Sequence, residues 1–557
     1  MCYNLGIAQT SSPYDKGLIM NKLFLVLLSC ICLIIYAGYL NNAFVFDDKI
    51  LVENNPLVKS ARLLPNVFKS GIYDYWAGAA PYDRMYRPLQ MLSYYIDYSL
   101  WGLSPAGFRF SNILLHLFNA ILVFYLFNLL FRQKALAFSA SLLFMVHPVQ
   151  VSTVAYISAR GDLLSAFFIL ACCILFLKFL LSDNSIFYFL SMLSAGLAFL
   201  SRENALLITI FLIPVIYASN RGGHKLRYLR GFLILSAAYL AIRLLIFGVS
   251  GLATHTGHIQ GVLSLINLLN IAWRYVLLLL WPADLRMFHS TAFINPTGTF
   301  ILFLFLAGLA LLLTAIFKWQ KIKAMPQVII FGLAWFIFAI IPVYYYFDAY
   351  PALGVALMAE NWLYLPAIGF CIVTAYLCLL NKRGRLIIYT WAIILGMLAV
   401  SNQVYWRNDV TFYKRALQFL PEDSIIQRNL VTAYIDAGDL PGAAKAIEVL
   451  ERYYMDTPVV DLARGQYYFA CGQAKEALNY YQRIISKSFF SNYSISLCYA
   501  KLGDANKAIA FSQASFKQNP FFQKNLRHLA SLYSESGQLE LAHKYLLLAK
   551  QLDPKSR

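Results

Sequence analysis

Long apolar runs recur through residues 23–404, whereas the chain after residue 404 has the composition of an ordinary soluble helical protein. A helix needs about 20 mostly apolar residues to cross the hydrocarbon core of a bilayer. The runs therefore predict a polytopic bundle of membrane-spanning helices. The eleven expected spans are 23–40, 110–131, 135–151, 162–181, 186–200, 203–219, 231–248, 299–317, 327–346, 361–380 and 386–404. A twelfth apolar run, 262–281, fits either a crossing or a re-entrant or interfacial segment.

Basic residues between the runs predict the topology, because cytoplasmic loops of membrane proteins are enriched in lysine and arginine. Lys16 and Lys22 precede the first span and assign residues 1–22 to the cytoplasm. The other basic loops are Arg132/Lys134, Lys178, Arg221–Arg230, Lys318–Lys323 and Lys382–Arg385. They all fall on the cytoplasmic side only if 262–281 does not cross. Eleven crossings then place the loop 41–108 and everything after residue 404 outside the cytoplasm. If 262–281 also crossed, every segment after it would change sides, and the basic loops from residue 318 onward would lie outside.

The formal net charge of +19 does not indicate nucleic-acid binding. Such binding needs a basic face with base-reading or stacking elements, whereas these basic residues lie mostly in short loops between apolar runs. Six of the nine cysteines lie inside apolar runs, where a thiol usually packs as a small hydrophobe, so no disulfide framework is expected. The first apolar run has no clear small-residue cleavage site and is expected to remain as a span.

The loop 41–108 carries its own helical pattern. Leu89, Leu92, Ile96 and Leu100 recur at helical spacing, with polar and aromatic residues between them. Such amphipathic segments lie along a membrane surface. We therefore expect helices of this loop to lie at the outer interface.

A repeat of about 34 residues fills residues 405–557. Glycine, tyrosine and alanine recur in register, and Trp406 to Pro421 forms a partial first unit. The recurring positions are Gly438, Gly472, Gly503 and Gly537; Tyr434, Tyr468, Tyr499 and Tyr533; Ala443, Ala477, Ala508 and Ala542. The pattern resembles the tetratricopeptide repeat (TPR), in about four copies. A TPR solenoid offers a concave surface for an extended peptide or a partner; the alternative is a rigid spacer.

Two adjacent carboxylates, Asp47 and Asp48, follow the first span. Carboxylates crowded near a low-dielectric boundary can have one raised pKa, and such a group can act as a general base or as a metal ligand. An acidic pair at the start of a loop is, by itself, more often a solvated turn.

Further charged and histidine residues lie near the predicted outer side, where charges close to the membrane are functional candidates. They are His147, Arg160, Asp162, Arg202, Glu203, Arg274 and Glu360, with Arg87 and His116 as further candidates. Local ion pairs and a packed interfacial histidine would explain the same residues without function. Phosphate-binding glycine loops, zinc motifs and hydrolase triads do not occur at credible positions.

Several of these stretches together resemble the TMTC-type proteins, transmembrane and TPR-containing members of the GT-C glycosyltransferases related to protein O-mannosyltransferases. The matching stretches are Phe46-Asp47-Asp48, Tyr86-Arg87-Pro88-Leu89, Asn112 through His116 to Asn119, His147 to Asp162, Arg202-Glu203 and Ala359 to Pro366. The resemblance covers about 40–557. It implies an all-α chain, with a GT-C-like transmembrane domain over 23–404 and a TPR domain over 405–557.

The resemblance also implies a reaction. A sugar, mannose in the related enzymes, would move from a polyprenyl or dolichyl phosphate to a hydroxyl of an exported protein, with inversion. Asp48 or Asp47 would be the general base, and Arg160, Arg202, Arg274 and Arg87 would hold the donor phosphate, because the planar guanidinium engages phosphate oxygens in pairs. The TPR array would recruit the acceptor. A Mg or Mn ion on Asp47 and Asp48 stays open; the resemblance favours its absence, because GT-C enzymes with monophosphate donors often work without a metal.

Family members commonly differ at Asn361-Trp362 and carry more repeats, which bears on the choice of acceptor. The expected location is a bacterial inner membrane with periplasmic repeats, or the endoplasmic reticulum with lumenal repeats in a eukaryote. Three alternatives remain at this stage. They are a non-enzymatic scaffold for envelope assembly, a flippase or transporter of lipid-linked sugars, and a transferase acting on a glycan or lipid.

Overall fold

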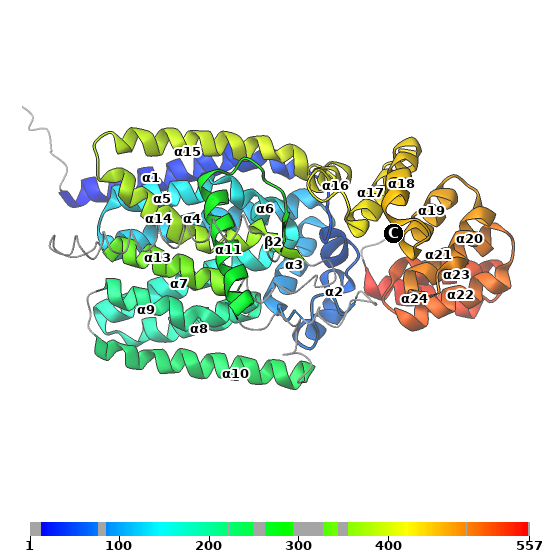
Figure 1. Cartoon of the computed structure of the whole chain (residues 1–557). Coiled ribbons are helices and arrows are strands. Elements are labelled where there is room, and N and C mark those ends of the chain that lie inside the picture. Colours follow the sequence, from blue (N-terminus) through cyan, green and yellow to red (C-terminus); the bar gives the residue numbers. More distant parts are fainter. Residues whose placement is uncertain are drawn as a thin grey trace, which may run out of the picture.

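The computed structural model describes residues 13–75, 85–219, 223–248, 262–292, 327–342, 355–485 and 487–554. Apolar helices form one body, and the repeat helices form a second body at one end of it (Figure 1). The start of α1 (Pro13–Tyr36) lies at the far end of the apolar body from the repeats. The expected span 299–317 and the basic loop Lys318–Lys323 lie outside the described residues.

Five helices in the described part of the chain are long and apolar enough to cross a membrane: Lys22–Asn41, Pro105–Phe131, Ile157–Ser182, Lys225–Phe247 and Gly384–Trp406. A sixth candidate is the pair Lys134–Val146 and Pro148–Ala155, which bends by 51°. The break coincides with Pro148, whose ring cannot continue a helix from the residue before it. Further apolar helices are shorter: α8 (Ser185–Ser201), α9 (Ile208–Ala218), α13 (Gln327–Ile340) and α14 (Pro366–Leu379). The number of eleven crossings stays a prediction.

The apolar run 262–281 forms α11 (Val262–Leu280). In Figure 1 this helix runs across the direction of the long helices α1, α10 (Leu229–Phe247) and α15 (Gly384–Ser401). A helix that lies across a bundle does not use its length to traverse the bilayer, so this orientation favours an interfacial or re-entrant segment.

The core of the apolar body consists of α4 (Pro105–Phe131), α5 (Lys134–Val146) and α7 (Arg160–Ser182). Their facing side chains, such as Phe124, Phe127 and Phe176, are fully buried. Two short strands were not expected from the sequence. Strands β1 (Phe288–Ala292) and β2 (Val355–Ala359) pair antiparallel, with Phe288 opposite Ala359. A five-residue apolar strand carries too little periodicity to be distinguished from helix in sequence, so the chain is nearly, and not wholly, helical.

The first outer loop lies between the two bodies (Figure 1). It contains α2 (Pro56–Lys59) and α3 (Pro88–Trp101), and the pattern Leu89 to Leu100 is helical as predicted. Ile96 and Leu100 of α3 are 57% and 67% exposed, and exposed apolar residues of this kind suit contact with lipid.

The repeats are pairs of antiparallel helices preceded by α16 (Asp409–Leu417). The pairs are α17 (Ser424–Asp436) with α18 (Leu440–Tyr454), α19 (Pro458–Ala470) with α20 (Ala474–Arg483), α21 (Phe489–Lys501) with α22 (Ala505–Gln518), and α23 (Gln523–Glu535) with α24 (Leu539–Leu552). Gly438, Gly472, Gly503 and Gly537 all have φ between +74° and +83°, a left-handed conformation that glycine adopts at helix ends without strain. The period seen in the sequence is therefore the period of the helix pairs.

Candidate functional site

Asp47 lies where the chain leaves the first helix and turns toward the repeats. The preceding residue, Phe46, has a φ of +52°, which directs the next residues back across the end of the bundle. Oδ2 of Asp47 accepts hydrogen bonds from the Tyr73 hydroxyl at 2.9 Å and the Tyr156 hydroxyl at 2.8 Å. Burial raises the pKa of the Asp47 carboxyl, and the two tyrosine hydrogen bonds oppose that rise. A carboxyl with a raised pKa is better matched to proton transfer near neutral pH.

Asp48 is fully buried and holds two segments together. Its Oδ1 accepts from the backbone N–H of Ser158 at 2.8 Å and from the Ser158 hydroxyl at 2.7 Å, while Oδ2 accepts from the N–H of Val45 at 3.4 Å. Burial raises the pKa of Asp48 to about 6, although the nearby Arg109 and these hydrogen bonds favour the charged form. Asp48 thus connects the first outer loop to the segment that leads into α7.

A cavity of about 480 Å³, here called the groove, lies between the first outer loop and the repeats. Asp47 lines it on the side of the loop, together with Phe46, Lys49, Ile50 and Asn54. The repeat residues that line it come from α16, α17, α19, α20, α21 and the start of α23. They are Asp409, Tyr413, Arg428, Asn429, Thr432, Ala433, Ile435, Asp436, Gln466, Phe469, Ala470, Tyr481, Phe490, Tyr493, Ser494, Leu497, Phe522 and Lys524. Of the two neighbouring aspartates, Asp47 lines the groove, whereas Asp48 does not.

Four of the predicted charged residues form a second, buried cluster. Nε of Arg87 donates to Glu203 at 3.0 Å, and a guanidinium N–H of Arg202 donates to Asp162. Asn361, part of the stretch that departs from the family pattern, donates to the same Asp162 oxygen at 3.0 Å. Asp162, Arg202 and Asn204 also line a small cavity of about 20 Å³ with Trp362 and Tyr364.

Arg160 lies apart from this cluster. It is 1% exposed, and its guanidinium pairs with Asp97 at 2.6 Å, donates to the Phe108 carbonyl at 2.6 Å and to Asn112, and lies 5.1 Å from the centroid of the Tyr94 ring. These contacts join α7 to α3 and α4. Arg160 therefore fixes the outer loop against the bundle.

The two predicted histidines are buried among backbone and aromatic partners. His116 bonds the Tyr364 hydroxyl at 2.8 Å and the Met145 carbonyl at 3.1 Å. His147 bonds the Leu279 carbonyl at 2.9 Å and accepts from the N–H of Val149, which caps the turn after α5. In these positions both histidines join helices of the core.

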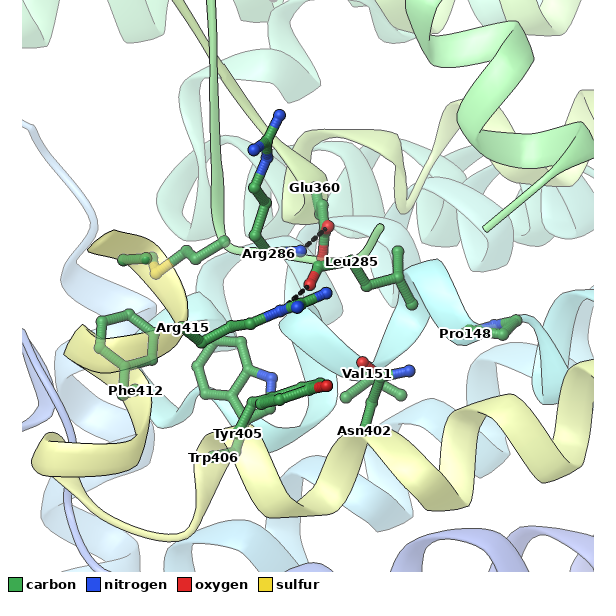
Figure 2. Close-up of a pocket in the computed structure, with 12 residues that line it drawn as sticks. Pro148, Val151, Leu285, Arg286, Glu360, Asn402, Tyr405, Trp406, Phe412 and Arg415 are labelled. Atoms are coloured by element: carbon green, nitrogen blue, oxygen red, sulfur yellow. Dashed lines mark hydrogen bonds between the residues drawn. The ribbon is translucent and has the colours of Figure 1, made fainter. Parts of the chain in front are cut away.

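Glu360 lies in a third place, a pocket at the junction of β2, the end of α15 and α16 (Figure 2). Its Oε1 accepts from the N–H of Arg286 and from Nε2 of His289 at 3.0 Å. Burial raises the pKa of Glu360, and the contacts with His289 and Arg286 oppose the rise. Figure 2 shows Arg415 extending from α16 over Tyr405, and its Nε donates to the Leu285 carbonyl at 3.1 Å.

Two arginines, Arg286 and Arg415, line this pocket. The guanidinium carbons of Arg286 and Arg415 lie 3.8 and 4.7 Å from the centroid of the same ring, that of Phe419. Burial lowers the pKa of Arg286, and the positive charges of Arg415 and Arg274 contribute in the same direction. The sequence analysis identified Arg274 and Glu360 but missed Arg286 and Arg415. Arg286 lies in the loop before β1, and Arg415 lies in α16, so neither stands out in the sequence. Only the folded chain, in which β1 pairs with β2, brings them together.

Aromatic side chains in mutual contact link the lining of the arginine pocket to the lining of the groove. The Trp406 ring lies 5.9 Å from Tyr156 and 5.2 Å from Phe412, and Phe412 lies 5.7 Å from Phe46. Trp406 and Phe412 line the arginine pocket, while Phe46 lines the groove. Since Tyr156 also bonds Asp47, one layer of side chains connects the candidate base to the arginines.

Asp47 and Asp48 are the residues that could hold a divalent cation. Within the described part of the chain, no group of three or more histidine, cysteine, aspartate or glutamate side chains is placed to hold a metal ion. Oδ1 of Asp48 and Oδ2 of Asp47 each already accept two hydrogen bonds. The two carboxylates therefore do not form a ready ligand set.

Comparison with known proteins identifies relatives of the kind that the motifs predict. A family model described as a tetratricopeptide repeat matches residues 528–556. The chain is 27% identical over 451 residues to the Caenorhabditis elegans protein O-mannosyl-transferase F38B6.6, which covers 78% of this chain and 63% of that protein. It is 24% identical over 485 residues to the human protein O-mannosyl-transferase TMTC4, covering 74% and 64% respectively. The chain thus spans less than two thirds of the length of these relatives.

Among solved structures, a crystal structure of MamA protein is similar to part of the chain, with a TM-score of 0.22 and 20% identity over 26% of this chain and 81% of that chain. The relatives, in contrast, align with about three quarters of the chain. The resemblance predicted from the motifs is confirmed: over most of its length this chain is similar to the TMTC-type proteins named protein O-mannosyl-transferases.

Proposed function

We propose that this chain is an integral-membrane glycosyltransferase that moves a sugar from a polyprenyl or dolichyl phosphate to hydroxyl groups of exported proteins. The relatives named O-mannosyl-transferases support this reaction class and suggest mannose as the sugar. The observation that carries the proposal is the position of Asp47. It lines the groove beside the repeats and accepts a hydrogen bond from Tyr156, whose ring packs against Trp406 of the pocket that Arg286 and Arg415 line.

Asp47 is the general base in this proposal. The acceptor hydroxyl gives its proton to Asp47 while its oxygen bonds to the anomeric carbon, and the bond from that carbon to the phosphate oxygen breaks, its electron pair leaving with the phosphate. Attack from the face opposite the phosphate inverts the anomeric centre. Burial, which raises the pKa of Asp47, makes it a stronger base than an exposed aspartate. Asp48, tied to Ser158 and Val45, is a positioning residue that holds the loop carrying Asp47.

Arginines of the pocket shown in Figure 2 hold the leaving phosphate in this proposal. Arg286 and Arg415 line this pocket, and the charge of Arg274 also acts on Arg286. Clustered guanidinium groups stabilise the charge that develops on a phosphate oxygen. Arg202 and Arg87, each paired with a carboxylate, and Arg160, committed to Asp97, position the surrounding helices. This assignment differs from the one that the resemblance implies, in which Arg160, Arg202 and Arg87 share the phosphate with Arg274.

The TPR array recruits the acceptor on the outer side of the membrane. In a bacterium that side is the periplasm, and in a eukaryote it is the lumen of the endoplasmic reticulum. Recruitment next to the site raises the local concentration of acceptor hydroxyls without adding catalytic groups.

Replacing Asp47 with asparagine tests the proposal. Wild type and the variants Asp47→Asn and Asp48→Asn would be produced at matched levels in cells lacking the native protein, followed by peptide mass spectrometry of exported and membrane proteins. We expect hexose additions on serine and threonine with wild type and a loss of about 10²-fold or more with Asp47→Asn. Asp456→Asn, the same chemical change at an exposed repeat position, is the matched control. Equal profiles for wild type and Asp47→Asn would reject Asp47 as the base, and hexoses only on glycans or lipids would change the acceptor class.

A further inference from the structure

The repeat array is attached to the first outer loop at its beginning. Nζ of Lys49 lies 2.6 Å from Asp409 of α16 and 3.2 Å from Asp436 of α17. The N–H of Phe46 donates to the other oxygen of Asp409 at 2.9 Å. These contacts place the first repeat helices directly beside Asp47.

The array is attached to the same loop again at its end. Asp553, just after α24, pairs with Lys59 at 3.2 Å and accepts from the Tyr98 hydroxyl at 2.7 Å. Tyr75 packs edge to face against Phe521, with ring centroids 4.7 Å apart. Both members of the Lys59–Asp553 pair are buried, so this contact is a built interface rather than a surface ion pair. The loop and the array therefore close around the groove from both ends.

The groove between these attachments has little net charge. Its acids are Asp47, Asp409 and Asp436, and its bases are Lys49, Arg428 and Lys524. Lys49 pairs with two of the acids, and the three acids and three bases balance in number. Such a surface does not select a polyanion, which would be bound by an excess of basic residues.

Amide, hydroxyl and aromatic side chains cover most of the remaining wall. Asn54, Asn429, Gln466 and Thr432 carry groups that both donate and accept hydrogen bonds, as the backbone of an extended chain does. Aromatic rings, among them Phe490, Tyr493 and Phe522, offer flat apolar contact between them. Side chains of these kinds can bind the main chain of a peptide while accepting many different side-chain sequences.

We propose that the groove binds an extended, unfolded segment of the acceptor polypeptide, enclosed between the repeat array and the first outer loop, with a serine or threonine of that segment beside Asp47. This inference rests on the function proposed above and adds that the acceptor binds as an unfolded segment. The attachments bound the groove at both ends, and this enclosure favours a single extended chain over the surface of a folded domain. Modified residues then lie in stretches that are unfolded when they reach the enzyme.

Binding of peptide to the purified full chain tests this inference separately from the chemistry. The probe is a fluorescently labelled, unstructured peptide rich in serine and threonine, and the readout is fluorescence anisotropy. Ala470, exposed at the end of α19, lines the groove, and Ala470→Trp would fill it. Ala510, exposed within α22 and outside the groove, provides the matched control Ala510→Trp.

We expect Ala470→Trp to weaken peptide binding at least tenfold, while Ala510→Trp binds as wild type does. Anisotropy requires no sugar donor, so the readout is independent of transfer, and failure of the chemistry and failure of the binding inference give different results. Equal binding by Ala470→Trp and wild type would overturn the inference. Displacement of the peptide by a neutral oligosaccharide, or tighter binding of the same sequence held in a folded domain, would overturn it as well.

Discussion

The Tyr156 hydroxyl donates a 2.8 Å hydrogen bond to Oδ2 of Asp47, and the ring of the same tyrosine packs 5.9 Å from Trp406. Tyr156 thus contacts the candidate base with one end and the wall of the arginine pocket with the other. A single buried side chain joins the two halves of the proposed reaction.

Removing the Tyr156 hydroxyl should raise the pKa of Asp47. The hydrogen bond stabilises the carboxylate, so its loss favours the protonated form, which cannot accept a proton. For Tyr156→Phe we expect the acidic limb of the pH–rate profile to move upward by about one pH unit, with the rate at high pH changed less. Tyr73→Phe, which removes the other donor to the same oxygen, should move the limb in the same direction. An unshifted limb in both variants would show that Asp47 does not control it.

Asp48 should make folding stability depend on pH. Its pKa in the folded protein is about 6, against an ordinary value of 3.8, so the folded state binds the proton more tightly than the unfolded chain does. The stabilising contribution is complete below pH 3.8 and is lost as the pH rises through 6. We expect the Tm of wild type, measured relative to Asp48→Asn, to fall across this range. Asp456→Asn should show the same pH dependence as wild type, because that carboxyl is exposed.

The repeats were readable from sequence because their signal is local. Gly438 and Gly472 recur at a fixed spacing, and each adopts the left-handed conformation that the turn between paired helices requires. Likewise, the apolar runs that fall within the described residues correspond to apolar helices. Local composition and period carry this information, and no contact between distant residues is needed to see it.

The pairing of charges could not be read in the same way. Arg160 has the position that the family motif gives to a phosphate ligand, yet its partner Asp97 comes from α3, a distant helix of the outer loop. Arg415 gives no sign in the sequence that it faces Glu360, because β1, β2 and α16 meet only in the fold. The side of the bundle that carries the site stays a prediction from sequence, and the choice of arginines depends on tertiary contacts that sequence does not reveal.

Breaking the buried attachment at the end of the array should loosen the last repeat. Asp553→Asn keeps an acceptor for Tyr98 but leaves Lys59 buried without its counter-charge, a change that typically costs about 3–5 kcal/mol. We expect faster hydrogen exchange in α24 and α2, measured by mass spectrometry, with α17 to α19 unchanged. Asp504→Asn removes the exposed Asp504–Lys507 pair and should leave exchange in α24 unaltered. If exchange in α24 of Asp553→Asn equals that of wild type, the attachment does not hold the last repeat.

Removing the charge of Arg415 should weaken binding of the donor phosphate. Arg415 and Arg286 lie against the same Phe419 ring, and Arg415→Gln keeps an N–H donor near the Leu285 carbonyl while removing one positive charge. For a short polyprenyl monophosphate in detergent we expect the Kd to rise about tenfold and to depend less on salt, because one charge-assisted contact is lost. Isothermal titration calorimetry measures both, and Arg464→Gln in the repeats is the matched control. If Arg415→Gln binds the polyprenyl monophosphate with unchanged affinity, the phosphate does not bind in this pocket. Arg202, which pairs with Asp162, would then be the next arginine to replace.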